Sequence, residues 1–225
     1  MADVAHPSSA ASAPARRPSP LRKALRSPAT LFGVALVAIH LFLALFAPLI
    51  APHSISAIFT DGLTPPSPEH WLGTDQIGRD YLSRLMSGGR VALLVSAIGV
   101  AVAVVVGTAL GLLAGYLGGW LDDAVMRATD TLMSIPEIVL IAILVLTFGK
   151  DLAALSAIVA VVYTPGVVRV VRARAISLAA LDYVRAAELR GESRGFILFR
   201  EIAPNLSGLL AVELAIRVSA AVLKI

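Results

Sequence analysis

Five apolar runs, separated by polar segments, divide the chain. No run alternates with a period of two, and a chain in lipid must satisfy its own backbone hydrogen bonds, so each run is expected to be a helix. A helix of roughly 20 residues spans a hydrocarbon core of about 30 Å. The pattern predicts an all-α integral membrane protein, a polytopic bundle of five transmembrane helices. The runs cover residues 31–51, 91–114, 132–148, 152–168 and 206–223.

The polar segments set the predicted domain boundaries and orientation. Residues 1–30, rich in Ala, Ser, Pro and Arg, are typical of a disordered basic cytoplasmic tail, and residues 52–90 of an external loop with an amphipathic lead-in. With the tail inside, the inner segments hold thirteen Lys and Arg residues and the outer segments four. We therefore expect a cytoplasmic N-terminus. A cleaved signal peptide is the alternative interpretation of residues 31–51.

Composition agrees with this class. The chain is 57% apolar and 15% charged, with a mean hydropathy of +0.83, against about 45–50% and about 25% in soluble domains. Because the net charge of +4 follows from the topology, it does not indicate a nucleic-acid partner. The sequence holds no cysteine, which excludes disulfides, thiolate metal sites and a cysteine nucleophile.

One densely charged segment interrupts the apolar pattern between the last two runs. Its spacing predicts a helix over 183–190, capped by Asp182 and ended by Gly191. A second helix is expected to follow Ser193 and to stop near 203, because Pro204 disfavours helix in the residue before it. The segment has two interpretations: a solvated cytoplasmic loop, or a docking surface for a soluble partner.

The amino-acid sequence of this segment also resembles that of a known protein family. "YVRAAELRG" followed by "FREIAPN" resembles the EAA loop of binding-protein-dependent ABC importer permeases. "HWLGTDQIGRDYLSRLMSGGR", "WLDDAVMRATDTLMSIP" and "VVRVVRARAISL" resemble other stretches of the dipeptide, oligopeptide and nickel branch of that family, in the same order. The resemblance covers about residues 31–225. The basic tail before the first span resembles the shorter-loop second permease subunit of that branch.

The resemblance implies a type I ABC importer permease of the bacterial inner membrane. Its permease core would be residues 91–225, and the EAA-type loop, residues 169–205, would carry a coupling helix that docks on a cytoplasmic ATPase. Expected partners are a second permease subunit, two ATPase subunits and an external solute-binding protein, with ATP and Mg²⁺ held by the ATPases and no cofactor on this chain. The cargo is expected to be peptides or a related small solute. The coupling residues implied are Tyr183, Val184, Arg185, Ala186, Ala187, Glu188, Gly191, Pro204 and Asn205.

The sequence departs from the family's pattern at three positions of this loop. Arg185 stands where the family has Glu, Arg190 replaces a hydrophobic residue, and Glu201 replaces His. Reversing a charge on a docking helix weakens an ion pair unless the partner is complementary. Either the cognate ATPase has changed to match, or coupling is impaired.

No enzymatic motif accompanies the loop. The Gly149-Lys150 pair lacks the remaining letters of a phosphate-binding P-loop, so ATP hydrolysis is expected from partner subunits and the chain is not expected to be an enzyme. His70, Asp75 and Asp80 cluster in the sequence, but their spacing fits no usual ligand set. They are interpreted as a structural lead-in to the second run, with no metal.

Small and charged residues inside the runs suggest further contacts. Gly107, Gly111 and Gly115 share one helical face and predict a packing seam, either within the chain or against the partner permease. Glu213 and Arg217 are four residues apart and are expected to pair, as a structural or a pathway-lining pair. Glu137 is a further candidate for the pathway.

The number of runs leaves a question of completeness. The family has six spans and the pattern predicts five, so we expect a C-terminal truncation. A truncated, non-transporting membrane scaffold is therefore the alternative function. A secondary transporter is less consistent with the sequence, which shows neither an internal repeat nor several acids within the spans.

Overall fold

The computed structural model describes residues 27–59 and 62–224. The predicted basic tail falls outside these residues as far as position 26, so it stays a prediction. In the described part of the chain the regular elements are all helices, which confirms the all-α fold class. They are α2 (Pro28–Ile50), α3 (Tyr81–Leu117), α4 (Gly119–Met133), α5 (Glu137–Phe148), α6 (Leu152–Ala179), α7 (Asp182–Leu189), α8 (Arg194–Phe196), the π-helix η1 (Ile197–Ile202), the 3₁₀ helix η2 (Ala203–Leu206) and α9 (Ser207–Val222).

Within residues 27–59 and 62–224, four helices are long and apolar enough to cross a membrane: α2, α3, α6 and the continuous helical stretch Arg194–Val222. The third predicted span, 132–148, is not one straight helix. It is broken between α4 and α5, which meet at 89° and make a fifth span only if counted together. The break is at Pro136, which cannot donate a backbone hydrogen bond and disfavours helix in the residue before it.

Three helices extend beyond their apolar runs, into segments predicted as tail or loop. The Asp80 carboxylate accepts the Ser83 N–H and caps α3, so this helix takes in the last ten residues of the predicted external loop 52–90. At the other end, α6 continues to Ala179, so the first part of the predicted coupling loop 169–205 is helix. Helix α2 similarly begins at Pro28, inside the predicted tail.

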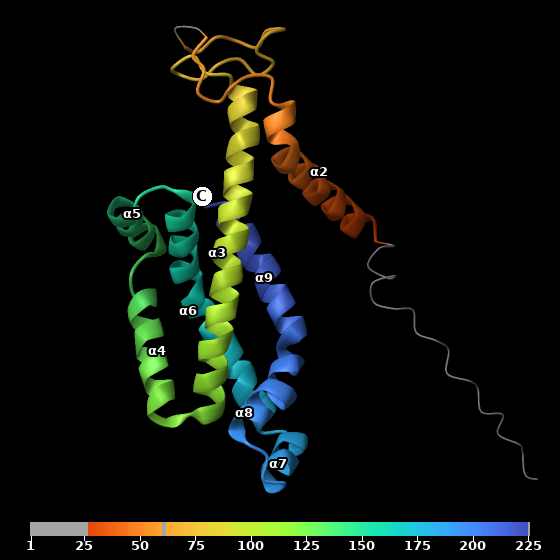
Figure 1. Cartoon of the computed structure of the whole chain (residues 1–225), viewed down its shortest axis with the longest axis vertical. Helices are drawn as coiled ribbons and strands as arrows, with labels where there is room; N and C mark the ends of the chain where they lie inside the picture. Colours follow the sequence, from red (N-terminus) through yellow and green to blue (C-terminus); the bar gives the residue numbers. More distant parts are fainter. Residues whose placement is uncertain (1–26, 60–61, 225) are drawn as a thin grey trace, which may run out of the picture.

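Helix α3 runs along the long axis of the molecule, with α6 beside it, as Figure 1 shows. The loop between α2 and α3 lies at one end of this axis and α7 at the other (Figure 1). The described part of the chain thus has two polar ends joined by apolar helices, as the order of apolar and polar segments predicts.

Small residues allow α3 and α6 to approach closely. A Cβ added at Gly107 would lie 2.6 Å from the Val167 Cβ, and one at Gly111 would lie 2.8 Å from the Val168 carbonyl oxygen. One at Gly115 would lie 2.7 Å from the Arg172 carbonyl oxygen. The face of α3 that carries these glycines therefore packs against α6 of the same chain. We call this contact the glycine seam.

The seam extends further than the sequence analysis placed it. A Cβ on Gly99, two turns before Gly107, would lie 2.6 Å from the Ser156 carbonyl oxygen. Ala103, between the two glycines, is fully buried. Over this length the backbone of α3 lies against the backbone and the short side chains of α6, so the two helices form one packed unit.

Candidate functional site

The loop between α6 and α9 is built around the short helix α7. Gly191 has a φ of +77°, a backbone conformation that favours glycine. Its N–H donates to the Glu188 carbonyl (2.9 Å), and the Glu192 N–H donates to the Ala187 carbonyl (3.2 Å). These are the two hydrogen bonds of a Schellman motif, and they end α7 at a defined residue.

The two ends of the loop differ in detail from the sequence prediction. Asp182 is the first residue of α7 and not its cap; Leu181 holds the cap position, and its carbonyl accepts the Val184 N–H. Ser193 does cap the next helix, since its hydroxyl accepts the Phe196 N–H at 3.2 Å.

Helical structure does not stop at 203 but continues through Pro204. The backbone widens to a π-helix in η1 and tightens to 3₁₀ in η2, and Pro204 lies in the first turn of the latter. Proline is tolerated in a first turn, where its missing N–H would have no partner within the helix. The chain therefore returns to α9 through a deformed helix rather than through an open turn.

A buried apolar cluster fixes α7 to the bundle. Val184 and Ala187 are fully buried, on one face of α7. They belong to a cluster shared by α3, α6, α7, η1 and η2, which we call the anchor cluster. Its buried members are Leu112, Val167, Val171, Ala175, Leu178, Val184, Ala187, Ile197, Leu198, Ile202 and Leu206.

The opposite face of α7 is exposed at the tip of the molecule. Tyr183, Arg185, Ala186 and Glu188 lie on it. Leu189 adds an apolar side chain that is 90% exposed. Of the nine predicted coupling residues, the structure buries Val184 and Ala187 and exposes the other seven, which are these four together with Gly191, Pro204 and Asn205.

The sequence analysis missed two exposed apolar side chains near this face. Leu189 was not singled out, and neither was Phe199 of η1, which is 74% exposed. The amphipathic period of α7 was the available signal, because Leu189 falls on the side opposite Val184. An exposed leucine beside charged residues at a helix tip suits a contact with another protein.

Polar contacts tie α7 to the end of the loop at Asn205 and to α3. The Asn205 side-chain amide donates to the Glu201 carbonyl at 2.6 Å and to the Tyr183 hydroxyl at 3.3 Å. At the far side of α7, the Tyr116 hydroxyl of α3 donates to the Glu188 carboxylate at 3.3 Å. Tyr183 and Asn205, which are 22 residues apart, therefore meet.

Ion pairs join α4 to α6 near the same end. The Arg172 guanidinium donates two hydrogen bonds to the Asp122 carboxylate, and Arg169 pairs with Asp130 at 2.5 Å. A forked arginine–carboxylate contact fixes orientation as well as distance. It holds α4 against α6 where the loop to α7 begins.

Charged residues of the apolar spans pair in two separate places. Glu213 and Arg217 of α9 form an ion pair at 2.6 Å, and both side chains are largely buried. The Arg217 guanidinium lies against Gly166 of α6, within 2.7 Å of where a Cβ would be. Glu137 pairs instead with Lys224 at 2.6 Å, so the three residues predicted for a pathway do not form one group.

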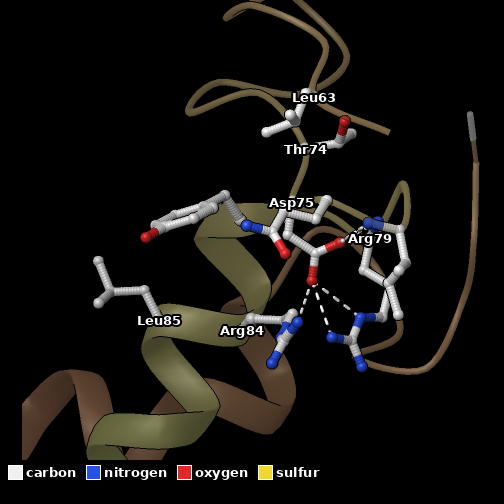
Figure 2. A pocket seen from close by; sticks show the side chains of 9 residues that line it. Leu63, Thr74, Asp75, Arg79, Arg84 and Leu85 are labelled. Atoms are coloured by element: carbon white, nitrogen blue, oxygen red, sulfur yellow. Dashed lines mark hydrogen bonds and ion pairs between the residues drawn. The ribbon is translucent and has the colours of Figure 1, made fainter. Parts of the chain in front are cut away.

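The loop between α2 and α3 does not bring together the three residues considered as a metal set. Asp75 is held by Arg79, whose guanidinium lies 2.9 Å from the carboxylate, and by Arg84 of α3. Figure 2 shows both arginines directed at this carboxylate, beside a pocket of about 540 Å³. Partial burial raises the pKa of Asp75, but hydrogen bonds from the Arg79 and Ile77 N–H groups and from the guanidiniums hold that pKa well below its usual range.

Comparisons with known proteins agree with this architecture. Residues 107–225 match the family described as binding-protein-dependent transport system inner membrane component. The chain is 35% identical over 198 residues to the probable D,D-dipeptide transport system permease protein DdpC of Escherichia coli K12, covering 88% of this chain and 66% of that protein. It is 41% identical to the dipeptide transport system permease protein DppC of the same strain, covering 88% and 68%.

A putative peptide permease protein of Brucella abortus is 31% identical, with 88% of this chain and 66% of that protein covered. The chain thus spans about two thirds of the length of the curated relatives it matches. The family match covers more than half of the chain, and it includes the glycine seam from Gly107 onward, the anchor cluster and α7. The chain belongs to the family of inner membrane components of binding-protein-dependent transport systems.

Proposed function

We propose that this chain is a permease subunit of an ATP-driven importer and forms part of the translocation pathway for di- or oligopeptides or a related small solute. Family membership supports the transport role. The names of the relatives, which are dipeptide and peptide permeases, support the cargo class. The single observation that carries the proposal is α7, an amphipathic helix fixed to the bundle on one face and exposed on the other.

In this proposal the exposed face of α7 docks on a cytoplasmic ATPase subunit. Leu189 would enter an apolar pocket of the ATPase, and Arg185 and Glu188 would pair with charges around it. Val184 and Ala187 would act from inside, since both are buried in the anchor cluster. They would hold α7 to η1 and α6 rather than touch the partner.

The contacts of the loop suggest how ATPase motion would reach the membrane. A displacement of α7 pushes on the anchor cluster, which includes four residues of α6 between Val167 and Leu178. Rigid elements joined by packed side chains move as bodies about a few hinge residues. Gly191 and the deformed segment at Pro204 and Asn205 would serve as those hinges and set the angle at which α9 returns to the membrane.

The remaining subunits follow from the same proposal. A second permease would complete the pathway, two ATPase subunits would hold ATP and Mg²⁺, and an external binding protein would deliver the solute. The end of the molecule that carries α7 would face the cytoplasm, and the loop between α2 and α3 would face outward. The Glu213–Arg217 pair and Glu137 are proposed to line or brace the pathway.

Site-directed cross-linking tests the docking surface. Because the chain has no cysteine, single cysteines introduced as Leu189→Cys and Arg185→Cys are the only reactive thiols in it. Both are expected to cross-link to the ATPase encoded nearest this chain, with a yield that changes on ATP binding. The control is Trp71→Cys, at a side chain 69% exposed in the outer loop, which should give no such product.

Two results would contradict the proposal. One is labelling of Leu189→Cys in intact cells by a reagent that cannot cross the membrane, which would put α7 outside. The other is the absence of any cross-link to the ATPase although the assembled complex is recovered intact. A complex that forms and turns over ATP without passing solute would instead favour the scaffold alternative.

A further inference from the structure

Three potential metal ligands converge in the outer loop, at the opposite end of the molecule from α7. His53 follows α2, His70 lies in the middle of the loop, and Asp80 caps α3. The His70 Nδ1 lies 3.0 Å from the Asp80 Oδ1, and the His53 Nδ1 lies 3.8 Å from the same oxygen. One ligand atom from each residue lies within 4.8 Å of the others.

Burial separates this cluster from an ordinary surface group. The Asp80 side chain is fully buried, and that of His70 is 9% exposed. The other carboxylate oxygen of Asp80 accepts hydrogen bonds from the Ser83 N–H (2.8 Å) and hydroxyl (2.7 Å). These bonds fix the carboxylate so that the remaining oxygen, Oδ1, is directed at both imidazoles, as outer hydrogen bonds orient ligands in metal sites.

One nitrogen of the His53 ring lacks a hydrogen-bond partner in the described part of the chain. Its Nδ1 is buried and has no hydrogen-bond partner among the residues that the structure describes. The ring itself is held in place, since it contacts Phe59 edge-on with centroids 4.7 Å apart. Buried polar atoms without a partner are uncommon in folded proteins, and each calls for a bound ion, a water or a functional reason.

A cation among the three ligand atoms would satisfy all of them at once. Two imidazole nitrogens and one carboxylate oxygen suit Zn²⁺ and neighbouring transition ions and do not suit Ca²⁺ or Mg²⁺, which prefer oxygen. Around a tetrahedral zinc, ligand atoms are about 3.4 Å apart. The observed separations of 3.0 and 3.8 Å from the Asp80 Oδ1 lie on either side of that value.

The His53 residue also borders a pocket of about 680 Å³, together with residues from the end of α2 and from α3.

We propose that His53, His70 and Asp80 form a binding site for a divalent transition metal ion of the zinc class. The ion would clip the middle of the loop to the end of α2 and to the start of α3. The loop that carries the site lies at the opposite end of the molecule from α7, the helix proposed to dock on the ATPase (Figure 1).

Metal analysis of the purified full chain, made without a histidine tag, tests the site directly. After incubation with Zn²⁺ and dialysis, about one ion per chain is expected, and Co²⁺ in its place should give the visible absorption of a tetrahedral site. His53→Phe keeps a ring against Phe59 but removes the ligand, so affinity should fall by about 100-fold or more, since loss of an outer partner alone costs about 10–100-fold. The matched control is His40→Phe, at an exposed histidine of α2.

Thermal unfolding separates a lost ligand from a misfolded chain. With a chelator present, His53→Phe should unfold at the same temperature as the unsubstituted chain or higher, because the unsatisfied nitrogen is gone. With Zn²⁺ present, only the unsubstituted chain and His40→Phe should gain stability. The proposal is overturned if the unsubstituted chain keeps no zinc after dialysis, or if His53→Phe binds zinc as tightly as His40→Phe does.

Discussion

Replacing Gly191 with valine isolates the backbone contribution of the turn after α7. A Cβ at this position meets no atom within 4 Å, so the site has open space for the start of a side chain. Its cost is conformational, because the φ of +77° is unfavourable for any residue with a Cβ. That cost is about 1–2 kcal/mol, which is a factor of about 5–30 in the population of the present geometry.

Substrate-stimulated ATP turnover, measured in the complex reconstituted with its ATPases and binding protein, should fall by about the same 5–30-fold factor. Gly191→Asn should lose much less, since asparagine tolerates a positive φ. The matched control is Gly149→Val, at a glycine with a φ of +94° and equally open space at the end of α5. If Gly191→Val leaves stimulated turnover within twofold, or if Gly149→Val lowers it as much, the orientation of α7 does not limit coupling and the proposed hinge at Gly191 is wrong.

Three further predictions concern the framework around the loop. Gly111→Ala should destabilise the chain by about 1–3 kcal/mol, because its Cβ would meet the Val168 carbonyl, and should lower the melting temperature in detergent. The control on the same helix is Gly88→Ala, whose Cβ meets nothing within 4 Å and which should not lower the melting temperature. Arg172→Lys should lower that temperature by the equivalent of about 1 kcal/mol through loss of the forked contact with Asp122, while Arg174→Lys should not. The pKa of Asp75 is depressed in the folded state, so its stabilising contribution is present above the unfolded pKa near 4 and is lost as the pH falls through the folded value. Asp75→Asn should therefore reduce the fall in melting temperature at acid pH. If the melting temperature of the variant falls as steeply as that of the unsubstituted chain, the contacts with Arg79 and Arg84 do not stabilise the loop.

Features whose signal lies within a few residues could be predicted from the sequence. Gly191 follows an amphipathic stretch, and Ser193 precedes a helix that it caps. The pairing of Glu213 with Arg217 follows from their spacing on one helix. The placement of the cap of α7 at Asp182 was one residue off, because the Leu178 carbonyl accepts the Leu181 N–H and the chain turns there before α7 starts.

Features that depend on which helices face one another could not be predicted. Glu137 pairs with Lys224 across 87 residues, and His53 meets Asp80 only because the loop between α2 and α3 folds back over the start of α3. The effect of Pro204 was misjudged for a related reason. Proline breaks an isolated α-helix, but here η1 and η2 bury Ile202 and Leu206 on either side of it, and that packing favours a deformed helix over a break.

The distribution of burial decides which helices can transmit a movement of α7. Helix α7 buries two side chains and η1 buries Ile197, Leu198 and Ile202 in the same cluster, so a movement of α7 is expected to reach α6 both directly and through η1. The movement is then expected to pass from α6 to α3 across the glycine seam, because the two helices are closely packed there. Helix α5 buries no side chain in the described structure and is bent away from α4 at Pro136. A push on α7 is therefore expected to displace α3 and α6 together relative to α5, and the α4–α5 break is where an opening would have to form.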